Sequence, residues 1–244
     1  MNEAVLQKTS RFEKLKVLSG AQLKYIAFLS MLIDHVNKAL IYNFLDRDFP
    51  LIISDLFDIL GRIAFPIFAF LLVEGFFKTG SRKNYLLYLI TFGIISEVPF
   101  DMFSTCEFFQ PNANNIFFTL SLMLITIWII DSLKHKMENS GKFLWYLVSL
   151  VIVAAMCLVS MNLALDYEHH AILIGYFFYI FREKPILSIV FGYGSMLKET
   201  WSLLGFALTL LYNGKRGRQN KILNYLFYPV HLLILGLLRM YLGI

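Results

Sequence analysis

The sequence predicts an all-α, polytopic integral membrane protein with about nine transmembrane helices and a cytoplasmic N-terminus. The first observation behind this class is composition. Of the 244 residues, 58% are hydrophobic and 16% are charged, whereas a soluble domain carries roughly 25% charged residues. One water-soluble core of this size cannot hide so much apolar surface. The second observation is a succession of apolar stretches along the chain, and the third is that the loops between them alternate between basic and acidic.

Nine apolar stretches are expected to form the helices, because a bilayer core of about 30 Å requires roughly 20 apolar residues per crossing. They lie near residues 22–45, 57–77, 84–103, 115–133, 143–165, 170–181, 186–197, 200–212 and 224–243. The three stretches between 170 and 212 are short, and they can form tilted helices, a re-entrant pair, or two spans in place of three. The number of crossings is therefore roughly eight to ten.

The first stretch follows a basic segment, as the apolar part of a signal peptide does. It is too long for a signal peptide, is interrupted by Asp34 and His35, and lacks a small-residue cleavage site. We therefore expect this helix to be retained. The chain then consists of a basic cytoplasmic tail, residues 1–20, and a single transmembrane domain, residues 21–244.

The loop charges set the orientation. One side of the membrane receives the cations Lys8, Arg11, Lys14, Lys16, Lys78, Arg82, Lys83, Lys134, Lys136, Lys142, Arg182, Lys184, Lys215, Arg216, Arg218 and Lys221. The other side receives Asp46, Asp48, Asp55, Asp58, Asp101, Glu107, Asp166 and Glu168, with Arg47 and Lys198. Since basic loops stay in the cytoplasm, the N-terminus is expected inside and the C-terminus outside.

The same distribution argues against several classes of protein. The cations lie between apolar blocks and form no continuous patch, so the net charge of +5 does not indicate a nucleic-acid partner. Cys106 and Cys157 form no CxxC pair, which excludes a zinc module and a disulfide framework. No metal site is expected.

Ionisable residues inside the first two spans are the main functional signal. Each charged side chain near the centre of a span costs about 2.5–3.5 kcal/mol on the insertion scale, so such residues are rare unless they have a role. The residues concerned are Lys24, Asp34, His35, Lys38, Arg62 and Glu74.

Lys24 and His35 are eleven residues apart, so both point from one face of the helix with a rise of about 16 Å between them. Lys24 is expected at the cytoplasmic mouth and His35 past the midplane. Histidine suits proton transfer near neutral pH, which makes His35 the candidate general base. The structural alternatives are that Lys24 only extends to the interface and that His35 is bonded to a neighbouring helix.

The remaining charges of these spans have plausible ion-pair partners. Asp34 points about 100° away from His35, and it can pair with Lys38 one turn on or with Arg62 at a similar depth. A Lys24–Glu74 pair is also open. Arg62 and Asn115 are candidates for stabilising an oxyanion.

Polar residues also gather at the predicted outer mouth, where Glu97, Asn115, Asp166 and Tyr167 lie at helix ends. Ordinary capping is the alternative for Asp166. His231 follows Pro229 in the last span and is expected in its cytoplasmic third. There it either faces a ligand tunnel or donates to a carbonyl that Pro229 releases.

Long motifs link the chain to a known family. The motifs are Leu23-Lys24-Tyr25-Ile26-Ala27, Met31-Leu32-Ile33-Asp34-His35, Gly61-Arg62-Ile63-Ala64-Phe65-Pro66, Leu72-Val73-Glu74-Gly75-Phe76, Ile95-Ser96-Glu97-Val98-Pro99-Phe100-Asp101, Asn115-Ile116-Phe117-Phe118 and Phe227-Tyr228-Pro229-Val230-His231. They resemble the TraX family, named for a conjugation protein needed for pilin N-acetylation. The family is similar to a wider superfamily of transmembrane acyltransferases, including the acyltransferase-3 proteins. A basic residue, ten intervening residues and a histidine recur there, and Lys24 and His35 match this spacing.

The resemblance implies an acetyltransferase of the bacterial cytoplasmic membrane. Acetyl-CoA would bind on the cytoplasmic side, a histidine base would lie in the membrane, and an acceptor would arrive from outside. We accordingly expect catalytic roles for His35, Asp34 and Arg62, donor-binding roles for Lys24, Glu74 and His231, and acceptor-binding roles for Glu97, Asn115, Asp166 and Tyr167. The expected partners are membrane lipids, acyl-CoA, and an exported protein or surface glycan.

Two other functions remain open from the residues. Buried His, Asp, Glu and Arg also suit a small-molecule or proton-coupled transporter. A structural partner in surface-appendage assembly is a third reading, and it predicts that assembly tolerates His35→Ala. Binding of CoA with turnover of its thioester separates an acyltransferase from both.

Overall fold

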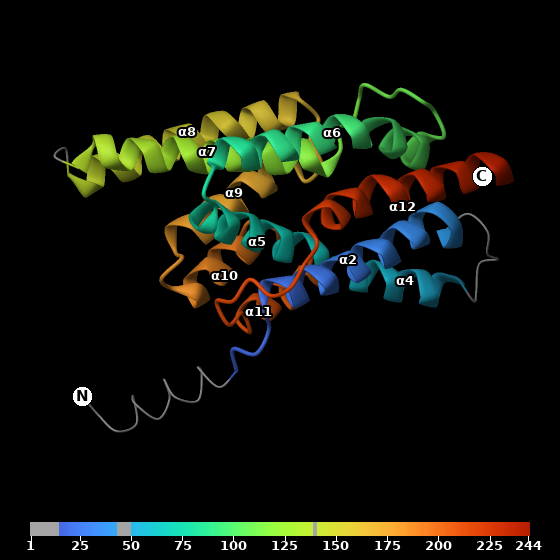
Figure 1. Cartoon of the computed structure of the whole chain (residues 1–244), viewed down its shortest axis with the longest axis horizontal. Coiled ribbons are helices and arrows are strands. Elements are labelled where there is room, and N and C mark those ends of the chain that lie inside the picture. The colour runs from blue at the N-terminus through green and yellow to red at the C-terminus, as the bar shows by residue number, and fades with distance from the viewer. Residues whose placement is uncertain (1–14, 43–49, 139–140) are drawn as a thin grey trace.

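The computed structural model describes residues 15–42, 50–138 and 141–244. Its regular elements over these ranges are helices, as the sequence predicts (Figure 1). Most of the predicted basic tail, with Lys8, Arg11 and Lys14, and the predicted loop charges Asp46, Arg47 and Asp48 lie outside the described residues.

The helices are α2 (Gly20–Val36), the π-helical turn η1 (Asn37–Ile41), α4 (Pro50–Gly61), α5 (Ala64–Lys78), α6 (Arg82–Thr105), α7 (Ile116–Lys136), α8 (Lys142–Asn162), α9 (Glu168–Ile180), α10 (Pro185–Gly194), α11 (Ser202–Thr209) and α12 (Lys221–Leu242). Most helices follow the predicted stretches, but α4 begins at Pro50 rather than near residue 57, so that Asp55 and Asp58, expected in an outer loop, lie within a helix.

Nine full crossings are only partly supported. Within the described residues, five helical stretches are long and apolar enough to span a bilayer: Leu51–Lys78, α6, α7, α8 and α12. By contrast α9, α10 and α11 have 13, 10 and 8 residues, which is short for a bilayer core. The chain is a multi-pass membrane protein in which α9, α10 and α11 are shorter than the other predicted spans.

A break between α4 and α5 corrects the prediction of one continuous helix over 57–77. The helix ends at Gly61, Arg62 lies in the break, and α5 begins at Ala64. Pro66 has no N–H group, so the carbonyl of Arg62 cannot receive its helical hydrogen bond. The Ser30 hydroxyl of α2 donates to the carbonyl of Leu60 at 2.5 Å. This bond stabilises the C-terminal end of α4, where the last carbonyls have no partner within the helix.

The start of α2 is fastened to the loop before α12. Ser19 caps α2 in a reciprocal capping box with Gln22. The N–H groups of Gly20 and Ala21 donate to the carbonyls of Lys215 and Arg216 at 2.8 and 2.9 Å. Residues 213–219 are thereby held beside the predicted cytoplasmic end of α2.

The helices form one packed bundle. In Figure 1, α6, α7 and α8 run side by side, α12 lies along α6, and α5 packs against α2, α9 and α11. The core contains Phe65 and Phe76 of α5. Large apolar side chains of α8, such as Leu150 and Val151, are exposed, as expected of a helix that faces lipid.

Candidate functional site

Two cavities lie at opposite ends of this bundle. The inner cavity, about 480 Å³, is bordered by the starts of α2, α6 and α12, the end of α5 and the loop 213–219. All of these segments are predicted to be cytoplasmic, and the cavity extends into the membrane as far as Ile116, Phe117 and Leu120 in the first turns of α7. The outer cavity, about 410 Å³, is bordered by the end of α2, the α4–α5 break, the end of α6 and the α8–α9 and α10–α11 connections. These segments are predicted to face outside.

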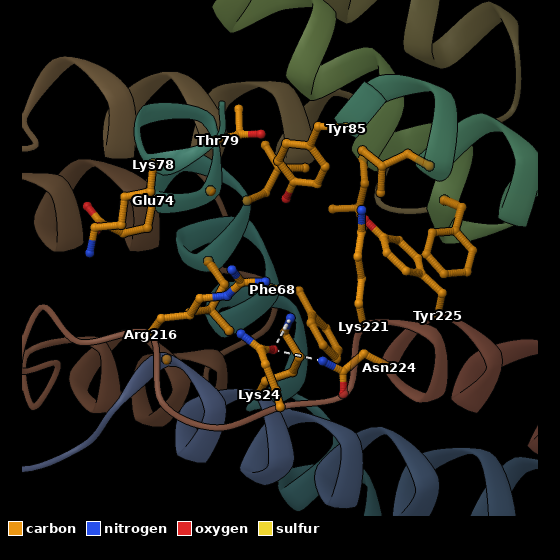
Figure 2. A pocket seen from close by; sticks show the side chains of 18 of the residues that line it. Lys24, Phe68, Glu74, Lys78, Thr79, Tyr85, Arg216, Lys221, Asn224 and Tyr225 are labelled. Carbon is orange, nitrogen blue, oxygen red and sulfur yellow. Dashed lines mark hydrogen bonds and ion pairs between the residues drawn. The ribbon is translucent and has the colours of Figure 1, made fainter. Parts of the chain in front are cut away.

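The inner cavity is strongly cationic. The charged side chains in its lining are Lys24, Glu74, Lys78, Arg216 and Lys221. Figure 2 shows that Lys24, Arg216 and Lys221 extend toward the same space from three separate segments. Four cations against one carboxylate make this cavity suitable for a polyanion.

The partners of Lys24 and Glu74 differ from the ion pair that the sequence left open. Lys24 Nζ donates to Oε1 of Gln219 at 2.9 Å, as drawn in Figure 2. Glu74 instead bonds Lys78 at 2.9 Å and Arg182 at 3.1 Å. Two other cations therefore neutralise the Glu74 carboxylate, and Lys24 forms no ion pair with it.

In the outer cavity, ion pairs connect the predicted catalytic residues to other partners. Of the two alternatives for Asp34, the structure has the pair with Lys38, at 2.7 Å. Arg62 pairs with Glu199 at 3.0 Å, so the second alternative, an Asp34–Arg62 ion pair, is not formed. The α4–α5 break turns Arg62 toward the connection between α10 and α11, where Glu199 lies.

Four side chains line both cavities: Met31, Phe68, Ile116 and Tyr228. They form a shared wall between the inner and outer spaces. Lys24 borders the inner cavity and His35 the outer one, although both belong to α2. One helix thus carries a cation on one side of the wall and an imidazole on the other.

His35 and His231 are in direct contact, which corrects the expected depth of His231. Nδ1 of His35 lies 2.7 Å from Nε2 of His231, so both rings are at the same level of the bundle. His231 is buried and lines neither cavity. Its Nδ1 bonds the carbonyl of Phe227 at 2.6 Å, and not that of Tyr225, the carbonyl that Pro229 releases. Its predicted contact with the acyl donor stays a prediction.

The predicted acceptor-binding residues fall into two groups. Asp166 and Tyr167 line the outer cavity, whereas Glu97 and Asn115 line neither cavity. Asn115 caps α7, accepting from the N–H of Phe117 at 3.0 Å, and its amide donates to Glu97 and to the carbonyl of Gly93. Glu97 and Asn115 therefore bond each other and lie outside the lining of the outer cavity. The segment that carries Asn115 still contacts the other group, because the N–H of Asp166 donates to the carbonyl of Asn114 at 3.3 Å.

Several residues of the site were missed by the sequence reasoning. Arg216 and Lys221 were used only to orient the chain, although their clustering in residues 215–221 was the available signal. Tyr228 stands within a recognised motif but received no role. No sequence pattern indicated that Glu199 belongs to the site, because its ion-pair partner Arg62 is 137 positions away. Among the described residues, no group of three or more His, Cys, Asp or Glu side chains is arranged to hold a metal ion.

Comparisons with known proteins agree with the family resemblance of the sequence motifs. A family model described as TraX protein matches residues 19–239. The chain is also 27% identical over 242 residues to a Dichelobacter nodosus protein called "Probable fimbrial assembly protein FimC, serogroup H1", covering 92% of this chain and 97% of that protein. No solved structure matches the chain. Because the family model covers nearly every helix and both cavities, the chain belongs to the TraX family.

Proposed function

We propose that this protein is a membrane-embedded acetyltransferase. It takes acetyl-CoA into the inner cavity and transfers the acetyl group to an amine or hydroxyl that enters the outer cavity. The observation that carries the proposal is the pair of cavities at opposite ends of the bundle, with a shared wall and His35 on its outer side. Such a site lets two substrates meet although each stays on its own side of the membrane.

The inner cavity supports the choice of donor. Acetyl-CoA carries several phosphate charges and is confined to the cytoplasm, and Lys24, Arg216 and Lys221 offer it three cations. From Lys24 to His35 the rise along α2 is about 16 Å, which an extended pantetheine arm can cover. The thioester can then reach the wall while the nucleotide remains at the mouth.

The reaction itself needs a base and charge stabilisation. The imidazole of His35 removes a proton from the acceptor, whose nitrogen or oxygen attacks the thioester carbonyl. The tetrahedral intermediate then collapses, the carbon–sulfur bond breaks, and the CoA thiolate leaves and is protonated. Arg62 lines the same cavity and is our candidate for stabilising the oxyanion, whereas the amide of Asn115 is already occupied.

The acceptor is proposed to be an exported protein, a pilin-like peptide or a surface glycan. The relative's name refers to fimbrial assembly, which fits modification of a surface filament. If the protein lies in the bacterial cytoplasmic membrane, as we propose, its outer cavity opens to the side at which exported molecules arrive.

His35→Ala tests the proposal. The purified protein in nanodiscs is given acetyl-CoA together with exported proteins or surface glycans of the host, and release of the CoA thiol is measured. We expect transfer to fall by roughly 10²–10⁴-fold, the usual contribution of a positioned base, with acetyl-CoA affinity retained. His135→Ala is the matched control, because His135 is exposed at the end of α7 and lines neither cavity.

A transporter is the second candidate, because ionisable residues within the spans and interrupted helices such as α4 and α5 are also expected of transporters. It predicts that wild-type protein in liposomes moves a solute and releases no thiol from acetyl-CoA. That outcome contradicts the acetyltransferase.

A further inference from the structure

The contact between His35 and His231 has the geometry of an in-plane hydrogen bond. The rings are inclined by only 15°, and their centroids are 5.0 Å apart, whereas the bonded nitrogens are 2.7 Å apart. The centroid separation exceeds the nitrogen separation by roughly two ring radii. The rings therefore meet edge to edge, each nitrogen lone pair or N–H lying in the plane of its ring, which is the favoured arrangement.

The second bond of His231 gives this contact a direction. A carbonyl oxygen only accepts, so the bond to Phe227 requires a proton on Nδ1 of His231. A neutral imidazole carries one proton, which leaves Nε2 of His231 as an acceptor. Nδ1 of His35 must then be the donor to it. By elimination, Nε2 of a neutral His35 carries a lone pair and no proton.

We propose that His231 is a positioning residue that holds His35 in this tautomer. This inference rests on the proposed function. Nε2 of His35 takes the proton of the attacking acceptor, and the resulting imidazolium keeps donating from Nδ1 to His231, which stabilises the new positive charge. The hydrogen bond to the backbone carbonyl of Phe227 fixes the tautomer and ring orientation of His231. In other catalytic sites a carboxylate or a carbonyl fixes a histidine in the same way. The proton passes to the departing CoA thiolate, which returns His35 to its starting state.

Two substitutions separate this role from a merely structural one. The side-chain amide of glutamine reaches about as far as Nε2 of histidine, so His231→Gln keeps an acceptor for Nδ1 of His35. The amide of asparagine reaches only about as far as Nδ1, so His231→Asn keeps a donor for Phe227 and loses contact with His35. If His231 is needed only to bond Phe227, asparagine can substitute for it. If His231 sets the tautomer of His35, glutamine can substitute for it and asparagine cannot.

The kinetic experiment measures transfer and acetyl-CoA affinity for the wild type and both variants in nanodiscs. We expect His231→Gln to retain transfer within a few-fold, and His231→Asn to lose roughly 10- to 1,000-fold in kcat at unchanged KM for acetyl-CoA. Equal activity of the two variants, or a better asparagine variant, overturns the positioning role.

The tautomer has its own readout, independent of turnover. The chain contains five histidines, so ¹⁵N-histidine spectra of the protein in lipid are sparse, and the His35 signals are identified by their loss in His35→Gln. At a pH where His35 is neutral we expect protonated Nδ1 and unprotonated Nε2, retained in His231→Gln and scrambled in His231→Asn. A proton on Nε2 of neutral His35 in the wild type overturns the inference. If this tautomer is found but the wild type transfers no acetyl group, the proposed function fails while the assignment of the hydrogen-bond chain stands.

Discussion

At the residue scale, partners within one helix could be read from spacing and partners across the bundle could not. Asp34 pairs with Lys38, and Glu74 with Lys78, each four positions on, as helical neighbours do. Glu74 also reaches Arg182, a contact that no local pattern indicates. Glu74 is thus paired with Lys78 of α5 and with Arg182, which follows the end of α9, and the ammonium group of Lys24 remains in the lining of the inner cavity.

Reversal of that charge is the first test at this scale. Lys24→Glu places a carboxylate among the cations that would hold the phosphates of acetyl-CoA, so we expect affinity for acetyl-CoA to fall by at least tenfold, about 1.4 kcal/mol. Binding is measured by titration of the purified protein at low ionic strength. Lys142→Glu is the control with the same change of net charge, since Lys142 is exposed and lines neither cavity. Similar losses in both variants would remove Lys24 from the donor site.

At the element scale, α11 packs closely against the break between α4 and α5. A Cβ atom at Gly205 would overlap the backbone carbonyl of Ile63, which lies in the break. Glycine is needed here because no flexible side chain is available to move aside. The approach lets α11 cover the break, and the connection before α11 brings Glu199 to Arg62.

Gly205→Ala is expected to destabilise the protein by about 1–3 kcal/mol, the usual cost of overpacking, although alanine ordinarily favours a helix. Thermal unfolding in detergent measures the effect. Gly194→Ala is the matched control, because a Cβ there would meet nothing within 4 Å, and its melting temperature should stay the same or rise slightly. An undiminished melting temperature for Gly205→Ala would contradict the close contact.

At the scale of the whole molecule, the two cavities separate two chemical environments. Four of the five charged side chains that line the inner cavity are cations, whereas both acids and cations line the outer cavity. The loop cations that predict the orientation also make the inner end of the bundle suitable for binding a polyanion. They therefore supply the charge that the proposed polyanionic donor requires.

Cysteine labelling tests this orientation. In a chain with Cys106 and Cys157 replaced by alanine, single cysteines are placed at Gly80 and at Asn112, both of which are exposed. We expect a membrane-impermeant maleimide to label Asn112→Cys in intact cells and Gly80→Cys only after permeabilisation, because the two positions lie at opposite ends of α6. The reverse pattern would place the cationic cavity outside and exclude cytoplasmic acetyl-CoA as its ligand.

The sequence by itself determined the helical membrane class, most helix positions and the placement of Lys24 and His35 on one face of α2. Apolar stretches must be buried in lipid or in the core, and spacing along one helix sets which side chains share a face, so both features are local. Only the tertiary structure decided that His231 meets His35, that Arg62 pairs with Glu199, and that four side chains divide the site into two cavities. These depend on a helix break and on the packing of segments up to 196 positions apart, which no local period encodes, because contacts between helices are set by the shapes that they bury together.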